Sequence, residues 1–345
     1  MKTVVILGWI LLLLLGSNLF AQSSSELIAR KRVLKLMGTR FEITALAEDI
    51  KLADIGIEAG IKEVQRIEKL ISSWDEHSQT SAINRNAGEH PVKVDKELYD
   101  LVARSLRISA LTNGAFDISF ASVGKLWKFD GSMQEPPSEQ VIAESIMRIN
   151  YKNIILNPQD TTVFLKEKGV KIGFGGIGKG YAAEQAKSVM QAMGINNGVV
   201  SAAGDLTTWG KRQDGNVWDV AIAKPDKSRQ ILAWLEANET SVVTSGNYEK
   251  FFIHEGRRYA HIIDPRTGYP TTGLKSATII CTNAELADAL ATTMFVMGKT
   301  EGLALINQLK GIECLLITDD DQLISSNNLN INYQVAEQVT ERSHN

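Results

Sequence analysis

The spacing of apolar residues along the chain predicts both helices and strands. Over residues 52–73, apolar side chains recur every three or four positions, as they do on the buried face of an amphipathic helix. The same spacing predicts a helix over residues 96–111, which Asn113 and Gly114 would end. Apolar and polar residues alternate over residues 32–46, which predicts the start of a pair of strands.

The rest of the chain continues this mixture. Ser138 follows two prolines and is a typical N-cap, so a helix is expected from there to about residue 147. Further helices are predicted at 181–193, 284–297 and 300–309, and short strands at 154–156, 162–165, 199–202, 218–223, 241–244, 251–253, 259–263, 276–282 and 311–318. Helices and strands do not alternate regularly. The pattern therefore favours an α+β fold with mixed or antiparallel sheets flanked by helices over a doubly wound parallel sheet.

The N-terminus has the pattern of a secretory signal peptide. Lys2 precedes a long apolar run, and small residues lead to a cleavage site after Ala21. The alternative is an uncleaved membrane anchor, because the apolar run approaches the length that spans a bilayer. The chain is thus divided into a signal peptide (1–21), a polar linker (22–31), a folded part that forms one domain or two intimate subdomains (32–330), and a polar tail (331–345).

Charge and cysteine content exclude several classes of protein. The 345 residues carry 37 Lys and Arg against 40 Asp and Glu, a net charge of −3, whereas a general nucleic-acid binder is usually basic. Cys281 and Cys314 are too few for a disulfide framework or a cysteine-rich zinc site. We interpret them as buried free thiols, although export would permit a disulfide.

The glycine-rich stretch at 173–180 is a candidate phosphate site. Its glycines fit the spacing of a dinucleotide-binding fingerprint, but no acidic residue follows about 20 positions later. It also resembles a P-loop, except that Gly180 stands where the metal-binding Ser or Thr belongs. What remains is an exposed backbone at a helix N-terminus with Lys179 beside it, a favourable place for a phosphate. The alternative is a tightly packed glycine turn.

Two other segments carry candidate chemistry. Asp288 and Thr292 lie four positions apart on a predicted helix, so they share a face and offer the oxygen ligands that Mg²⁺ prefers. An unrelated pair of surface side chains is the alternative. His261 could accept a proton near neutral pH, with Asp264 or nearby backbone fixing its tautomer. Its structural alternative is to brace the turn that follows it.

These segments, taken in order, resemble those of one known family, the FAD:protein FMN transferases, also called ApbE flavin transferases. The matching motifs are Met37-Gly38-Thr39, Ser73-Trp74 with Ser81-Ala82-Ile83-Asn84, Gly114-Ala115-Phe116-Asp117, Gly175-Gly176-Ile177-Gly178-Lys179-Gly180-Tyr181-Ala182, Ala203-Gly204-Asp205, Thr244-Ser245-Gly246, the stretch from His261 to Gly268, and Ala287-Asp288-Ala289-Leu290-Ala291-Thr292. The resemblance implies an ApbE-like α+β fold and a Mg²⁺-dependent enzyme. Such an enzyme splits the pyrophosphate of FAD, attaches FMN through a phosphoester to a Thr of a partner protein, and releases AMP.

The resemblance also implies roles for individual residues. The metal would be held by Asp288, Thr292 and the backbone carbonyl of Gly176, and His261 would be catalytic. Contacts to the FAD substrate would come from Met37, Trp74, Ala115, Phe116, Asp117, Lys179 and Ile263. The chain departs from the family pattern at three positions, where Gly173 replaces an Asp, Glu184 replaces an Asp, and Ala291 replaces a second carboxylate found in some members.

The implied partners are exported acceptor proteins with an FMN-binding domain, such as subunits of Na⁺-translocating NADH:quinone reductase or of Rnf-type electron-transport complexes. The protein would act in the periplasm or on the periplasmic face of the inner membrane. Two other functions stay open. One is a Mg²⁺-dependent FAD pyrophosphatase, in which water replaces the acceptor Thr. The other is a non-catalytic flavin-binding protein.

Overall fold

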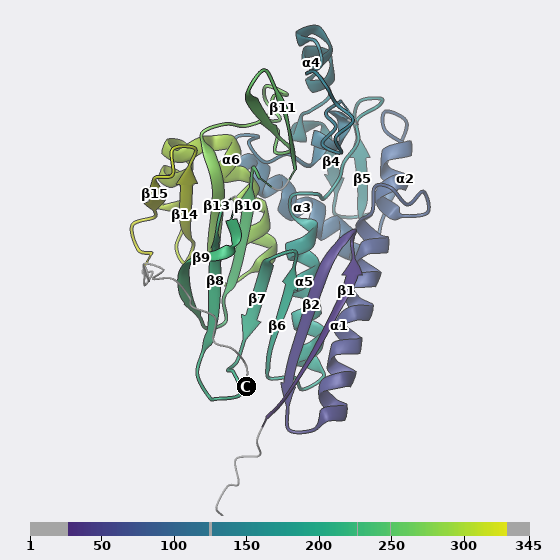
Figure 1. Cartoon of the computed structure of the whole chain (residues 1–345). Coiled ribbons are helices and arrows are strands. Elements are labelled where there is room, and N and C mark those ends of the chain that lie inside the picture. The colour runs from purple at the N-terminus through teal and green to yellow at the C-terminus, as the bar shows by residue number, and fades with distance from the viewer. Residues whose placement is uncertain (1–26, 124–125, 226, 249, 330–345) are drawn as a thin grey trace, which may run out of the picture.

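The centre of the protein is one large antiparallel sheet. The computed structural model describes residues 27–123, 126–225, 227–248 and 250–329. In the sheet the strands run in the order β1-β2-β6-β7-β10-β13-β14-β15 (Figure 1). These strands are β1 (Ile28–Leu36), β2 (Thr39–Ala47), β6 (Asn197–Ala202), β7 (Asp205–Trp209), β10 (Ser241–Gly246), β13 (Leu274–Cys281), β14 (Glu313–Thr318) and β15 (Leu323–Ser325).

Three long helices lie side by side and pack against the sheet. They are α1 (Ile50–Ile71), which contacts β1 and β2, α5 (Gly178–Ala192), which contacts β6 and β7, and α6 (Ala284–Ile306), which contacts β10 and β13 (Figure 1). The apolar faces of α1, α5, β2 and β6 form the main core, and α6 forms a second core with β10, β13 and β14. By length and composition α6 could cross a membrane, and it is the one such helix among the described residues; half of its most apolar stretch is buried inside the protein.

Smaller elements complete the molecule. The hairpin of β8 (Trp218–Lys224) and β9 (Lys227–Ala237) packs on Val242 and Ile280 of the large sheet. The elements α4 (Glu139–Ile146), β4 (Ile154–Asn157), β5 (Thr162–Leu165) and β11 (Phe251–His254) lie above one end of the sheet (Figure 1). The remaining elements are α2 (Gln79–Arg85), α3 (Lys96–Leu111), η1 (Ile118–Val123), η2 (Tyr151–Asn153), β3 (Val92–Lys93) and β12 (Arg257–Ala260).

The α+β fold with an antiparallel sheet flanked by helices is confirmed, and most predicted elements are present. Helix α3 has the predicted bounds, and Ser138 caps α4 by accepting from the backbone N–H of Val141. The two helices predicted at 284–297 and 300–309 form one element with a non-helical break at Gly298 (φ 70°, ψ −179°). Both cysteines are buried free thiols.

Three differences matter, and two predictions fall outside the described residues. Strand β1 begins at Ile28, inside the segment predicted as a linker, so regular structure is present before residue 32. The strand predicted at 259–263 is wrong at its end, because β12 stops at Ala260 and leaves His261 in a loop. Helix α2 and strands β3, β7, β9 and β15 were not predicted. The predicted signal peptide (1–21) and polar tail (331–345) lie outside the described residues.

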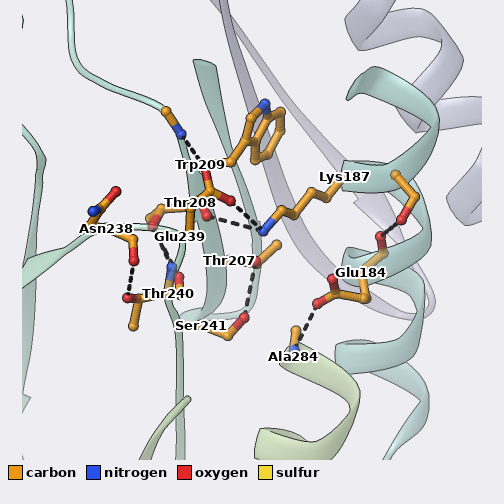
Figure 2. Close-up of polar contacts among 12 residues, drawn as sticks. Glu184, Lys187, Thr207, Thr208, Trp209, Asn238, Glu239, Thr240, Ser241 and Ala284 are labelled. Atoms are coloured by element: carbon orange, nitrogen blue, oxygen red, sulfur yellow. Dashed lines mark hydrogen bonds and ion pairs between the residues drawn. The ribbon is translucent and has the colours of Figure 1, made fainter. Parts of the chain in front are cut away.

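Helix α5 is tied to its neighbours by polar contacts along its length (Figure 2). The buried ammonium of Lys187 donates to the carbonyl of Thr208 on β7, at 3.4 Å, and pairs with Glu239 at 3.3 Å. One turn earlier, the Glu184 carboxylate accepts from the backbone N–H of Ala284, at 2.8 Å (Figure 2). A carboxylate at a helix N-terminus is favourable, so this contact fixes the start of α6 against α5.

The first turn of α5 also touches α6 directly. A Cβ on Gly180 would lie 2.1 Å from the carbonyl oxygen of Ala284 and 2.7 Å from Cβ of Asp288. Glycine is therefore required at this position by the close approach of the two helices. Gly175, by contrast, faces open space, with nothing within 4 Å of such a Cβ.

We expect Gly180→Ala to destabilise the fold by about 1–3 kcal/mol, because an added methyl group forces the two helices apart. Gly175→Ala is the matched control and should leave the free energy of unfolding within about 0.5 kcal/mol of the wild-type value. Urea denaturation followed by circular dichroism measures both. Equal stability of the two variants would contradict the close contact at Gly180.

Candidate functional site

A lysine held between two carboxylates lies where α5, α6 and the sheet meet. The ammonium nitrogen of Lys179 is 2.8 Å from Oδ2 of Asp205 and 3.1 Å from Oδ1 of Asp288. Both carboxylates are buried, with exposed fractions of 6% for Asp205 and 1% for Asp288. The site therefore gathers two buried negative charges around one ammonium, and the Lys179 side chain is itself partly exposed, at 31%.

The positions of Lys179, Asp288 and Asp205 are each set by the element that carries them. Lys179 is the second residue of α5, and Asp288 stands in the second turn of α6. Oδ2 of Asp288 accepts from the backbone N–H of Gly180, at 2.9 Å, and so caps the first turn of α5. Asp205 begins β7 directly after the two-residue turn Ala203-Gly204, in which both residues have positive φ. Its Oδ1 accepts from the backbone N–H of Thr244 on β10, at 3.2 Å.

Burial and mutual charge set the protonation states. Burial disfavours the ammonium of Lys179, but the carboxylates of Asp288 and Asp205 outweigh it and raise the pKa of Lys179 above its ordinary value. Burial raises the pKa of Asp205; Lys179 opposes this shift and Asp288 adds to it. The lysine is thus firmly charged at neutral pH.

The glycine-rich loop contains both tightly packed glycines and glycines that leave room for a phosphate. Gly178 and Gly180 are packing glycines, since a Cβ on Gly178 would lie 2.8 Å from Ile71 and 3.7 Å from the terminal methyl of Met37. Gly175 and Gly176 form the accessible part. A Cβ on Gly176 would lie 3.3 Å from Oγ1 of Thr292 and 3.5 Å from the ring of Phe116. The fold thus brings Met37, Phe116 and Thr292 to the same loop that leads into Lys179.

The oxygen groups here suit Mg²⁺. Among the described residues there is no group of three or more His, Cys, Asp or Glu side chains that could hold a metal ion. Mg²⁺ does not need such a cluster, because it binds through one or two carboxylates together with substrate phosphates and water. Asp288 offers a carboxylate one helical turn from the Thr292 hydroxyl, and Gly176 lies beside that hydroxyl.

His261 lies just after β12. Its backbone N–H donates to the carbonyl of Lys250 at 3.0 Å, and its Nδ1 is 3.3 Å from the same oxygen. A carbonyl can only accept, so a neutral ring in this contact carries its proton on Nδ1 and leaves Nε2 as an acceptor. Burial lowers the pKa of His261 to about 4, the hydrogen bond to Lys250 opposes this, and the charges of Lys250 and Lys179 lower it further. His261 is therefore a neutral imidazole within electrostatic reach of Lys179.

Aromatic residues hold the loop of His261 in place. Phe129 packs edge-on against its ring, with centroids 6.4 Å apart. The indole N–H of Trp127 donates to the carbonyl of Gly268 at 2.8 Å. The Asp264 carboxylate pairs with Arg266, at 2.9 Å, and accepts from the backbone N–H of Arg266. Of the two orienting groups anticipated from the sequence, the backbone carbonyl contacts the imidazole, whereas Asp264 braces its own turn.

The other predicted flavin contacts have different surroundings. Oδ1 of Asp117 accepts from Ser119, and Oδ2 accepts from the backbone N–H of Tyr151 at 2.8 Å, so this carboxylate is already engaged in holding the chain. Ala115 is buried, and Ile263 is buried among aromatic residues of the His261 region. Trp74 lies on the surface, with 83% of its area exposed.

Asp205 was not among the candidate residues. It belongs to Ala203-Gly204-Asp205, one of the motifs that carry the family resemblance, but a carboxylate after an Ala-Gly turn is by itself typical of many loops. Nothing local shows that this turn lies beside α5, because that neighbourhood depends on the pairing of β6, β7 and β10.

The known proteins that this chain is similar to point to one family. Residues 37–316 match the ApbE family over most of the chain. The chain belongs to the ApbE family. A relative from Treponema pallidum, called FAD:protein FMN transferase, is 31% identical over 290 residues, which covers 78% of this chain and 80% of that protein. A protein of the same name from Klebsiella pneumoniae is 29% identical and covers 84% and 90%.

Solved structures of the family have the same fold. The ApbE protein of Thermotoga maritima superposes with a TM-score of 0.79 at 31% identity, covering 87% of this chain and 97% of that one. The flavin transferase ApbE of Vibrio cholerae gives a TM-score of 0.78 at 25% identity, covering 87% and 98%. The chain thus shares its overall fold with these two proteins.

The structure shows the surroundings of Gly173, Glu184 and Ala291, the three residues that depart from the family pattern. A Cβ on Gly173 would lie 3.1 Å from Cβ of Ala121, so a larger side chain there requires η1 to shift. Glu184 keeps a carboxylate at the start of α6. Ala291 is fully buried in the second apolar core, where an ionised carboxylate would be costly.

We expect the imidazole of His261 to titrate near pH 4 rather than near 6.5, because burial disfavours the imidazolium. Since the folded pKa lies below the unfolded one, the unfolded chain binds this proton first, and the stability contribution is lost as pH falls from about 6.5 to 4. NMR of ¹⁵N-labelled histidine measures the pKa, with His261→Gln to assign the resonance. A titration near 6.5 would show that the ring is solvated.

Proposed function

We propose that this protein is an FAD:protein FMN transferase that uses Mg²⁺ to move FMN from FAD to a Thr side chain of an acceptor protein and releases AMP. The observation that carries the proposal is the position of Lys179 and Asp288 beside an accessible glycine loop. Pyrophosphate binding requires backbone room, a cation and metal ligands together. Membership of a family whose relatives bear this name supports the same reaction.

Different residues would bind the phosphates, the metal ion and the flavin part of FAD. Gly175 leaves space over the loop for a phosphate, at the N-terminus of α5, and Lys179 supplies a point charge. A Mg²⁺ ion held by Asp288, Thr292 and the carbonyl of Gly176 would neutralise charge on the pyrophosphate. Met37 and Phe116 border the same loop and offer apolar surface to the flavin part of FAD. Trp74 presents an exposed ring on which a flat base or flavin can stack.

The transfer step needs a base, and His261 supplies it. The Thr hydroxyl oxygen of the acceptor attacks the phosphorus on the FMN side of the pyrophosphate. The new O–P bond forms as the P–O bond to the AMP phosphate breaks, and the bridging oxygen leaves with AMP and the electron pair. The hydroxyl proton passes to Nε2 of His261, because the Lys250 carbonyl keeps Nδ1 occupied.

The setting proposed for this reaction is outside the cytoplasm. The sequence pattern of residues 1–21 supports export, with the protein in the periplasm or on the periplasmic face of the inner membrane. The acceptors would be exported FMN-binding-domain proteins, such as subunits of Na⁺-translocating NADH:quinone reductase or of Rnf-type complexes.

Incubation with FAD, Mg²⁺ and an exported FMN-binding-domain protein tests the proposal. Intact-mass analysis should show the acceptor gaining one FMN phosphoester, and chromatography should show an equal amount of AMP. Replacement of the acceptor Thr by Val should abolish the mass gain. Free FMN in place of modified acceptor would instead identify an FAD pyrophosphatase, and unchanged FAD would identify a binding protein.

Asp288→Asn should abolish FMN transfer, because it removes the buried negative charge proposed to hold Mg²⁺. The amide oxygen can still accept from the N–H of Gly180, so the melting temperature should change little. Glu285→Gln is the matched control on the same helix, since that carboxylate faces Arg104 at 2.6 Å. Its transfer rate should stay near the wild-type value. Wild-type transfer by Asp288→Asn, with Mg²⁺ still required, would place the ion elsewhere.

His261→Gln should slow transfer by about 10²–10⁴, the usual contribution of a general base, while the affinity for FAD changes little. His254, on the neighbouring strand β11, is the control, since its Nδ1 contacts the carbonyl of Gln134. His254→Gln should transfer FMN at the wild-type rate. Single-turnover rates and calorimetric titration with FAD separate the two effects. A variant that loses affinity and stability together would show that His261 only braces its loop.

A further inference from the structure

Both oxygens of Asp288 are in use within the protein. Oδ1 lies 3.1 Å from the ammonium of Lys179, and Oδ2 accepts from the N–H of Gly180. A divalent cation bound by Asp288 would therefore meet a positive charge that is already paired with the same carboxylate. Two cations compete for one carboxylate, and the repulsion between them weakens whichever arrives second.

A second carboxylate lies on the other side of the ammonium. Oδ2 of Asp205 is 2.8 Å from Nζ of Lys179, closer than Asp288. It belongs to a different element, since Asp205 stands on β7 and Asp288 on α6. Its other oxygen is fixed by the backbone N–H of Thr244, at 3.2 Å. Lys179 can thus keep its ion pair with Asp205 when Asp288 binds another cation.

We propose that Asp205 is a positioning residue that keeps the Lys179 ammonium on the sheet side of the site, so that the ammonium and a divalent cation at Asp288 can be bound together. The inference rests on the proposed function only in taking Asp288 as a metal ligand. It adds a role for Asp205 that concerns the metal alone, before FAD or an acceptor is present.

The charges give the direction of each effect. With Asp205 ionised, Lys179 and the two carboxylates carry one net negative charge, which attracts a divalent cation. Asp205→Asn removes that charge and leaves Asp288 as the single carboxylate partner of the ammonium. Lys179→Met does the opposite, because it removes the competing cation and frees Oδ1 of Asp288. The two substitutions must therefore shift metal affinity in opposite directions.

The test is a titration with Mg²⁺ alone, with neither FAD nor acceptor, followed by calorimetry and by the rise in melting temperature. Asp205→Asn should lower the affinity about tenfold or more, and Lys179→Met should raise it by a similar factor, as expected for one charge a few ångströms away. The double variant should return close to the wild-type affinity. Asn keeps an oxygen for the N–H of Thr244, which preserves the local backbone contact.

Lys187→Met is the matched control. Lys187 is on the same helix and is also buried in an ion pair, but its partner Glu239 and the carbonyl of Thr208 belong to another site. It should leave Mg²⁺ affinity unchanged. If Asp205→Asn does not fold, Lys179→Met still tests the competition on which the proposal depends, and a Mg²⁺ affinity that does not rise in this variant would overturn it.

Shifts of Asp205→Asn and Lys179→Met in the same direction, or no response to Mg²⁺ in any variant, would overturn the proposal. A response confined to Lys179→Met would also overturn it, because the ammonium would then block the cation although Asp205 is present. These readouts do not involve flavin transfer. An enzyme that binds Mg²⁺ as described but modifies no acceptor would contradict the proposed function and leave the role of Asp205 standing.

Discussion

The contact of one lysine ammonium with two buried carboxylates is the constraint on which the site depends. Burying two carboxylates is costly unless each has partners in good geometry. Here the partners come from three separate elements: Lys179 from α5, Asp288 from α6 and Asp205 from β7. The ion cluster can form only if these elements reach their places to within a few tenths of an ångström.

Packing elsewhere in the molecule satisfies that requirement. Gly180 lets α5 approach α6 closely enough for Asp288 to cap it, and Glu184 fixes the start of α6 from the other side. The pairing of β7 with β10 places Asp205 beside the N–H of Thr244. The same close packing that stabilises the core therefore sets the geometry of the charged groups.

Burial, which strengthens the ion cluster, also lowers the pKa of His261. Excluding water disfavours a charged imidazole, and the nearby positive charge of Lys179 adds to this effect. A neutral ring whose Nδ1 faces a carbonyl presents Nε2 as an acceptor. Aromatic packing from Phe129 and the hydrogen bond of Trp127 to Gly268 hold that loop without further charge. The site thus separates a charged part, suited to phosphate, from a neutral base.

The sequence by itself determined the elements whose signals are local. Periodicity and capping gave α1, α3 and α4, and the ordered motifs gave the family, with Lys179, His261, Asp288 and Thr292 as candidates. It did not reveal α2, β7 or the short β15, because tertiary pairing decides such short or weakly patterned segments.

Only the tertiary structure decided which of the candidate site residues lie in contact with one another. It joined Asp205 to Lys179, divided the glycine stretch into packing and accessible positions, and engaged Asp117 in holding Ser119 and Tyr151. The physical reason is that the charge environment of a side chain depends on neighbours distant in sequence, and strand order and helix packing select those neighbours. The identity of a residue fixes what chemistry it can perform, and its buried surroundings fix its charge and its partner.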